Sequence, residues 1–255
     1  MSRRLSLTAA LLAGLLVSAS AARAGTPVDL ALVLTVDCSY SVDAREFALQ
    51  AQGLAQAFLD RSVVEAIAAG PNHAIAVSVV QWSSAASQVL VLPWTVVGDA
   101  DSAAAVAVRL AAMRRLTHDG ATSIASAIDY GVALLEAAPL AAMRRAIDIS
   151  SDGRNNSGID VRAARNAAVA RGITVNGLAI LNEVPTLHYY FEQHVVGGSG
   201  AFVVVAGSYD DYVAAIRRKI IREIAGDRLS DAGENAPRPA ARRPAAARFA
   251  IGGKG

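Results

Sequence analysis

Hydrophobic positions along this chain fall in short apolar runs that alternate with amphipathic segments. Residues 30–36 are apolar apart from Thr35, and polar residues bound the run on both sides. A run of this length predicts a strand buried on both faces of a parallel sheet. Residues 43–60, which follow it, carry Phe47, Leu54 and Phe58 at helical spacing and therefore indicate an amphipathic helix.

The same alternation continues to about residue 225. Pro93 lies within residues 88–96, which favours an edge strand antiparallel to the strand before it. Strands that alternate with helices indicate a doubly wound sheet with right-handed crossovers. We predict an α/β domain with a mostly parallel six-stranded sheet, one antiparallel edge strand and helices on both faces. The predicted strands are 30–36, 73–82, 88–96, 145–151, 173–181 and 202–205, and the predicted helices are 43–60, 63–69, 100–113, 123–138, 160–171, 187–195 and 211–225.

Both ends of the chain depart from this pattern. Residues 5–18 are apolar, with Arg3 and Arg4 before them and an Ala-Arg-Ala triplet ending at Ala24. This layout predicts a signal peptide over residues 1–24, cleaved after Ala24, and hence a periplasmic or secreted protein. A membrane anchor is the alternative, although the run is short for a bilayer. The arginine pair also leaves the twin-arginine route open, but the strong apolar core favours general secretion.

The domain is predicted to occupy residues 25–226. Residues 227–255 are rich in Pro, Ala and Arg without an apolar period, which predicts a disordered basic tail.

Composition and motifs exclude several functions. The formal net charge is +2 and the basic residues are scattered, so no nucleic-acid footprint is present. Cys38 is the only cysteine, and Arg45 follows it out of register for a cysteine phosphatase. The chain also lacks a G-x-S-x-G elbow, a P-loop and a G-x-G-x-x-G motif. We therefore predict a protein that is not an enzyme, with a metal-dependent hydrolase as a weaker alternative.

Oxygen-bearing side chains follow the predicted strands at one edge of the sheet. Asp37, Ser39 and Ser41 form a D-x-S-x-S pattern after the first strand, Thr122 precedes a helix, and Asp152 ends a later strand. Open α/β sheets place their ligands at the carboxyl ends of strands. Oxygen ligands favour a hard divalent cation, Mg²⁺ first, with Mn²⁺ or Ca²⁺ as alternatives. The simpler interpretation is that Asp37 and the serines cap the first helix.

The ordered set D-x-S-x-S, T and D-G resembles the metal-ion-dependent adhesion site (MIDAS) of von Willebrand factor type A (VWA) domains, and the resemblance covers about residues 28–225. Residues 144–153, 173–180 and 197–202 look like a bacterial exported subfamily without an assigned activity. The resemblance implies a Rossmann-like fold and a cation that leaves one coordination position for an acidic residue of a partner protein. The implied ligands are Asp37, Ser39, Ser41, Thr122 and Asp152.

Two residues depart from the common VWA pattern, which has glycine at both positions. Tyr40 separates the two serines, and Ala121 precedes Thr122. Glycine permits backbone angles that tyrosine resists, so either the loop has ordinary angles or Tyr40 is mildly strained. These departures leave a structural domain with a vestigial metal site as an alternative. We also hypothesise that Asp119 acts as an internal substitute for the partner's carboxylate.

The remaining polar and aromatic residues receive structural interpretations. Asp148 lies within a predicted strand and is not a candidate ligand. Asn155 and Asn156 are expected to shape a loop, and the four histidines have no metal-binding spacing. Residues 189–191 are expected to pack in the core. The basic residues of the last helix are expected near its end, where the helix dipole favours them; they are Arg217, Arg218, Lys219 and Arg222.

Overall fold

The computed structural model describes residues 25–117 and 120–226 of the 255-residue chain. The signal peptide predicted over residues 1–24, the hypothesis on Asp119 and the disordered tail predicted over residues 227–255 all lie outside the described residues. In the part that is described, no helix is long and apolar enough to cross a membrane.

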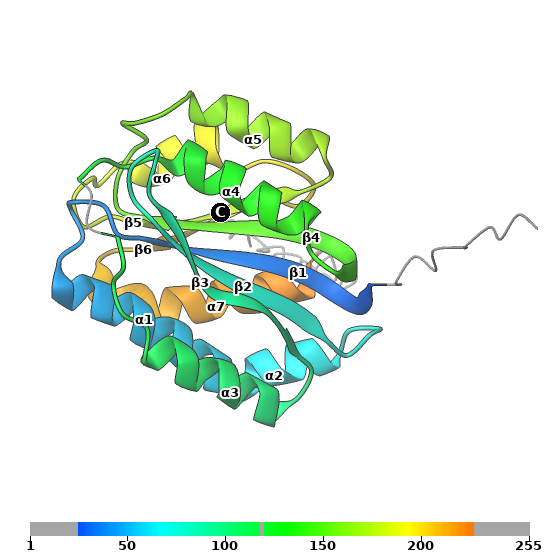
Figure 1. Cartoon of the computed structure of the whole chain (residues 1–255). Helices are drawn as coiled ribbons and strands as arrows, with labels where there is room; N and C mark the ends of the chain where they lie inside the picture. Colours follow the sequence, from blue (N-terminus) through cyan, green and yellow to red (C-terminus); the bar gives the residue numbers. More distant parts are fainter. Residues whose placement is uncertain (1–24, 118–119, 227–255) are drawn as a thin grey trace, which may run out of the picture.

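A six-stranded sheet forms the centre of the molecule (Figure 1). Its strand order is β3-β2-β1-β4-β5-β6, and only the edge strand β3 runs antiparallel to its neighbour. This arrangement confirms the predicted doubly wound fold, including the edge position that Pro93 favoured. The strands are β1 (Thr26–Asp37), β2 (Ile75–Trp82), β3 (Gln88–Val97), β4 (Leu140–Ser151), β5 (Thr174–Ile180) and β6 (Val203–Ala206).

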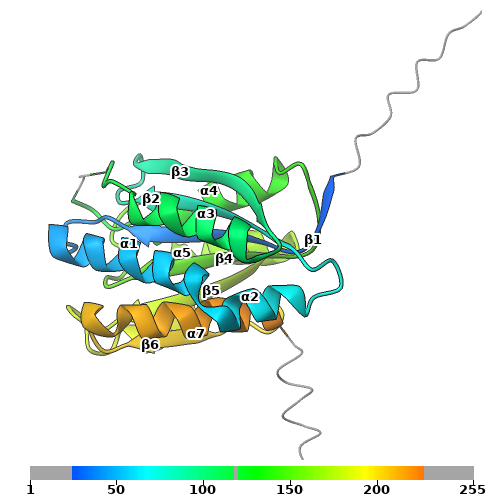
Figure 2. The same cartoon turned by 90° about the horizontal axis from the view of Figure 1, so that it is seen from below.

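Helices cover both faces of the sheet, in two separate hydrophobic layers (Figures 1 and 2). One face is covered by α1 (Ala44–Leu59), α2 (Arg61–Ala68), α3 (Ala100–Ala111) and α7 (Tyr212–Ala225). The other face is covered by α4 (Ile124–Glu136), α5 (Val161–Ala170), α6 (Leu187–Tyr190) and the π-helical turn η1 (Phe191–Val195). A 3₁₀ turn, η2 (Tyr209–Asp211), leads into α7.

The central strand β1 shows how the sequence divides between these layers. Leu30, Leu32 and Leu34 pack into the layer of α1 and α7, whereas Ala31 and Val33 pack into the layer of α4. Successive side chains of a strand point to opposite faces, so a continuous apolar run supplies both layers at once. The run predicted from the sequence is therefore the strand that carries the core.

Three details differ from the sequence predictions. Strand β4 begins at Leu140 rather than at Arg145, because its first residues pair with the start of β1. The predicted helix 187–195 is divided into α6 and η1, which buries Phe191 but leaves Tyr189 55% exposed. Of the four basic residues expected near the end of the last helix, only Arg222 lies in the last turn of α7, and Lys219 is fully buried. In each case pairing or packing with a distant segment overrides the local pattern.

Candidate functional site

The candidate site lies at the carboxyl edge of the sheet, where β1 and β4 are parallel neighbours. Asp37 is the last residue of β1, and Asp152 directly follows β4. In the register of these strands Val36 pairs with Ser150, so the two chains leave the sheet side by side. Thr122 joins them from the loop before α4, since a Cβ placed on Gly153 would lie 3.5 Å from its Oγ1.

Hydrogen bonds connect the predicted ligands. The Ser39 amide donates to Asp37 Oδ1 over 2.7 Å, and the hydroxyls of Ser39 and Ser41 are 3.3 Å apart. The Ser41 hydroxyl in turn donates to Asp152 Oδ1 over 2.7 Å. Loops that are far apart in the sequence thus bring the two carboxylates and the hydroxyls of Ser39 and Ser41 together, with Thr122 beside the neighbouring Gly153. The α1 N-cap is Asp43, whose carboxylate accepts from the Glu46 amide, so Asp37 and the serines do not cap this helix.

The Asp37 carboxylate is fully buried. Its Oδ2 accepts a short hydrogen bond from the Ser151 hydroxyl, while the Asp37 carbonyl accepts from Gln50 Nε2 over 3.0 Å. Burial raises the pKa of Asp37 to about 7, and the nearby Asp152 contributes to the rise. Neither Ser151 nor Gln50 was predicted from the sequence. The position of Ser151, directly before Asp152 at the end of β4, was the available signal for that residue.

The Asp152 carboxylate is also buried, and its Oδ2 has no hydrogen-bond partner within the described residues. Burial raises the pKa of Asp152. The buried Tyr209 hydroxyl lies close by and opposes the rise in the Asp152 pKa, while burial and the charge of Asp152 raise the pKa of the phenol. A carboxylate oxygen that is buried without a partner is costly. A cation beside Asp152 and Asp37 would remove this cost.

The donor set decides which metals this cluster suits. No group of three or more His, Cys, Asp or Glu side chains that could hold a metal lies in the described ranges 25–117 and 120–226. The candidate site therefore depends on hydroxyl oxygens beside its two carboxylates. Such an all-oxygen set fits Mg²⁺, Mn²⁺ or Ca²⁺ better than a metal that prefers nitrogen or sulfur ligands.

Arg115 holds the loop that carries the two serines. Its guanidinium donates to the carbonyl oxygens of Cys38 (2.8 Å), Ser39 (3.1 Å) and Val42. Three contacts to one loop fix the positions of the hydroxyls before any ligand binds. This role of Arg115 was not predicted, because no local pattern connects an arginine to a loop more than seventy residues earlier.

Asn155 and Asn156 hold the loop of Thr122. Asn156 Oδ1 accepts from the Thr122 amide over 2.8 Å, and Asn155 Oδ1 accepts from the Ala125 amide over 3.0 Å. The predicted loop-shaping role of both asparagines is thereby confirmed. Cys38, expected to be a small buried residue, is indeed buried.

Tyr40, the departure from the common VWA pattern, has an ordinary backbone conformation. Among the described residues other than glycine, only His73 has a positive φ. The Tyr40 amide donates to the Gly120 carbonyl over 3.2 Å, and its side chain is 86% exposed. The tyrosine therefore fits this loop without backbone strain and presents its ring to solvent beside the site.

Comparison with protein families gives one decisive match. The DUF1194 family, described as "Protein of unknown function", matches residues 27–228. The chain belongs to the DUF1194 family. None of the curated proteins matches it.

Solved structures similar to this DUF1194 chain have VWA-like folds. Proximal thread matrix protein 1 from the mussel byssus is 14% identical with a TM-score of 0.57, and the match covers 78% of this chain and 49% of that one. Another structure of that mussel protein is described as having a zinc-occupied MIDAS motif. A von Willebrand factor type A protein from Catenulispora acidiphila is 15% identical with a TM-score of 0.54, covering 78% and 43%.

The pilus adhesin SpaC from Lactobacillus rhamnosus GG is a third neighbour, 17% identical with a TM-score of 0.55. The match covers 78% of this chain and 30% of SpaC. This chain thus spans about half of the mussel protein and less of the other two. At these identities the likeness establishes the fold, and the resemblance to VWA domains is confirmed at that level.

Proposed function

We propose that this protein is an exported, metal-dependent protein-binding module. A divalent cation, Mg²⁺ first, binds at Asp37, Ser39, Ser41, Thr122 and Asp152 and holds a carboxylate of a partner protein. The observation that carries this proposal is the buried Asp152 Oδ2 without a partner, beside the buried Asp37 and three hydroxyls. Supporting evidence comes from the VWA-like fold, in which one neighbour has a metal-occupied MIDAS motif.

The chain's own residues account for the chemistry of this site. Asp37 and Asp152 supply negative charge, and the hydroxyls of Ser39, Ser41 and Thr122 supply neutral oxygens. Ser151 holds Asp37, and Arg115 holds the loop of Ser39 and Ser41. These ligands are therefore already ordered before the cation binds. Where the two carboxylates act partly through water, the cation keeps excess positive charge. A partner's Asp or Glu is then a stronger ligand in this partly desolvated site.

Export is part of the proposal because residues 1–24 have the layout of a signal peptide. The partner is a protein that presents an acidic residue at an exposed position. Tyr40, with its exposed ring beside the site, contributes to the rim that surrounds this residue. Nucleic acid is not a partner, since the charged residues form no basic stripe.

The test is calorimetric titration of Mg²⁺ and Mn²⁺ into the mature chain and three single variants. Asp37→Asn and Asp152→Asn should each abolish saturable binding, whereas Asp101→Asn, an exposed aspartate on α3, should leave it unchanged. The Asp37→Asn protein should remain folded by circular dichroism, because removing one of two neighbouring buried carboxylates relieves repulsion. An unfolded Asp37→Asn protein would count against the proposal.

A vestigial metal site is the second candidate, favoured by Tyr40 and Ala121 at positions where VWA domains commonly have glycine. A pull-down with the mature chain, in Mg²⁺ and in EDTA, separates the two candidates. Metal-dependent capture that Asp37→Asn abolishes supports the adhesion-type site. If the titration shows no binding, and neither the thermal stability nor the capture of a partner depends on metal, the vestigial metal site is established.

A further inference from the structure

A second site is suggested by a cavity at the opposite edge of the sheet. It has a volume of about 580 Å³ and opens beside the amino ends of β4 and β5 and the last turn of α7. Both ends of the described chain lie on this side (Figure 2). Its polar and aromatic lining includes Arg145, Thr174, Asn176, Ser199, Phe202 and Arg222. The volume falls within the range of small-molecule sites.

Three arginines line this cavity. Arg144 donates to the carbonyls of Glu223 and Ile224. Arg145 and Arg222 bring guanidinium groups from two different elements. Arg145 on β4 donates to the carbonyl of Arg171, and Arg222 on α7 lies over the Phe202 ring with its Cζ 4.0 Å from the centroid. Neither arginine has an ion-pair partner among residues 25–117 and 120–226. Both side chains are thus positioned by neutral groups and keep a full positive charge at the cavity.

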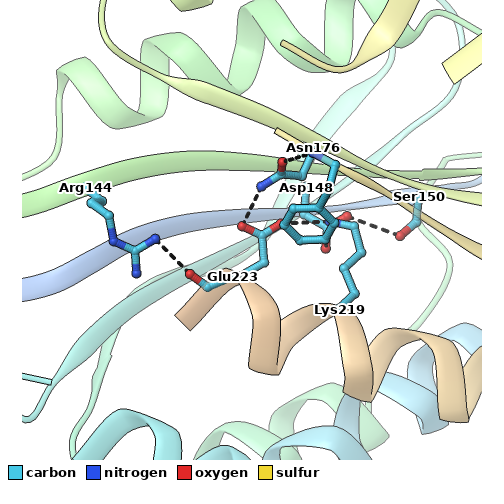
Figure 3. A network of polar contacts seen from close by, with 7 residues as sticks. Arg144, Asp148, Ser150, Asn176, Lys219 and Glu223 are labelled. Atoms are coloured by element: carbon cyan, nitrogen blue, oxygen red, sulfur yellow. Dashed lines mark hydrogen bonds and ion pairs between the residues drawn. The ribbon is translucent and has the colours of Figure 1, made fainter. Parts of the chain in front are cut away.

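The one carboxylate that lines the cavity, that of Glu223, has partners for both of its oxygens (Figure 3). Glu223 Oε1 lies 2.8 Å from the buried Lys219 Nζ, and its Oε2 accepts from Asn176 Nδ2 over 2.8 Å. Asn176 is fixed in turn, because its Oδ1 accepts from the Phe202 amide over 2.9 Å. The floor of the cavity is therefore an ordered polar network, in which the buried Lys219 is shared between Glu223 and Asp148.

Backbone donors complete the lining on a third side. The turn at residues 197–200 has Gly198 at φ +101° and Gly200 at φ +66°. Within the described part of the chain, the amides of Ser199 and Gly200 donate to no acceptor. Both residues line the cavity. Successive amides free in a turn of this kind form a concave surface that attracts anions.

We propose that this cavity binds a phosphate group. Guanidinium groups from β4 and α7, together with amides from the 197–200 turn, supply donors from three directions. A tetrahedral phosphate group presents oxygens in several directions and can accept from all of them, whereas one arginine suffices for a planar carboxylate. The phosphate belongs either to a soluble phosphate ester or to a phospholipid headgroup. This inference is independent of the metal site proposed at the other edge.

The experiment titrates inorganic phosphate into the metal-free mature chain at low salt. Arg145→Gln and Arg222→Gln should each weaken saturable binding by about ten-fold, the loss of one charge-assisted hydrogen bond. Arg218→Gln, an exposed neighbour on the same helix, should change it by less than about two-fold. Near-ultraviolet circular dichroism checks that each variant keeps the fold. Asp37→Asn should retain phosphate binding, which separates this test from that of the metal site.

A second arm identifies the source of the phosphate group. The same proteins are sedimented with vesicles of phosphatidylglycerol and of phosphatidylcholine, the latter without net charge. Binding to phosphatidylglycerol that Arg145→Gln and Arg222→Gln reduce, but Arg218→Gln does not, assigns the site to a lipid headgroup. Binding of inorganic phosphate alone assigns it to a soluble ester. Absence of any binding that depends on Arg145 and Arg222, or equal losses in Arg218→Gln, would overturn the proposal.

Discussion

The Ser41 hydroxyl donates a 2.7 Å hydrogen bond to Asp152 Oδ1 across 111 positions of sequence. This contact joins the loop after β1 to the residue that follows β4. It exists because the two strands are parallel neighbours that end at the same edge of the sheet. Any change that moves one loop therefore alters the other half of the candidate site.

Arg115 offers a test of how the loop is held. Arg115→Gln removes the guanidinium from the carbonyls of Cys38 and Ser39, so the hydroxyl of Ser39 is less well positioned. If the proposed cation binds, its affinity should fall by about ten-fold, as for other residues that orient metal ligands. Calorimetric titration of Mg²⁺ measures this effect. Arg114→Gln, an exposed neighbour, is the matched control, and equal affinities in the two variants would contradict the prediction.

The buried charges between α7 and the sheet offer a test of stability. Lys219 Nζ lies 2.7 Å from Asp148 Oδ2 and 2.8 Å from Glu223 Oε1, and all three side chains are buried (Figure 3). Lys219→Met should lower the free energy of unfolding by about 3–5 kcal/mol, because two buried carboxylates lose their counter-charge. Urea denaturation measures the change.

The exposed Arg218→Met variant is the control for the Lys219 prediction and should shift the unfolding free energy by less than about 0.5 kcal/mol. Combining Lys219→Met with Asp148→Asn and Glu223→Gln should recover part of the loss, since no uncompensated charge then remains. A Lys219→Met protein as stable as the parent would show that the ion pairs add nothing.

The same cluster predicts a pH dependence. Burial raises the pKa of Asp148 from 3.8 to about 6, although Lys219 opposes the rise. Between these two values the folded chain holds a proton that the unfolded chain has released. The contribution of Asp148 to stability is therefore greatest at low pH and is lost as the pH rises from about 4 to about 6.

Urea midpoints at several pH values test this sign. As the pH rises from about 4 to about 6, the parent should lose stability relative to the Asp148→Asn variant. Asp101→Asn, an exposed substitution, should give a difference that does not follow this trend. A pH-independent difference for Asp148→Asn would mean that its folded and unfolded pKa values are equal.

Gly177 on β5 tests the packing beneath η1. A Cβ at this position would overlap the Phe191 ring, which is fully buried. Gly177→Ala should therefore lower the free energy of unfolding by about 1–3 kcal/mol through overpacking. The double variant with Phe191→Leu should show a smaller loss than the sum of the single variants. If the losses of the two single variants simply added up in the double variant, the cost of Gly177→Ala would not arise from its contact with Phe191.

Local sequence patterns were sufficient to predict most of the fold. The apolar run at residues 30–36 supplies both core layers, and Pro93 marks the edge strand, because burial and backbone chemistry act at those positions directly. The five candidate ligands were predicted on the same basis, since the carboxyl ends of parallel strands share one edge. Their convergence follows from topology that the strand and helix order already implies.

The tertiary structure alone decided what surrounds these residues. Ser151, Gln50 and Arg115 contact the site through strand register and loop paths that no local pattern encodes. Lys219 is buried with Asp148 and Glu223 lying against it, and its position in the helix did not predict these partners. The cavity of Arg145 and Arg222 likewise arises where three elements meet. The sequence determined which segments form the sheet and its ligand edge, whereas long-range packing determined which charges are buried, paired or left facing a cavity.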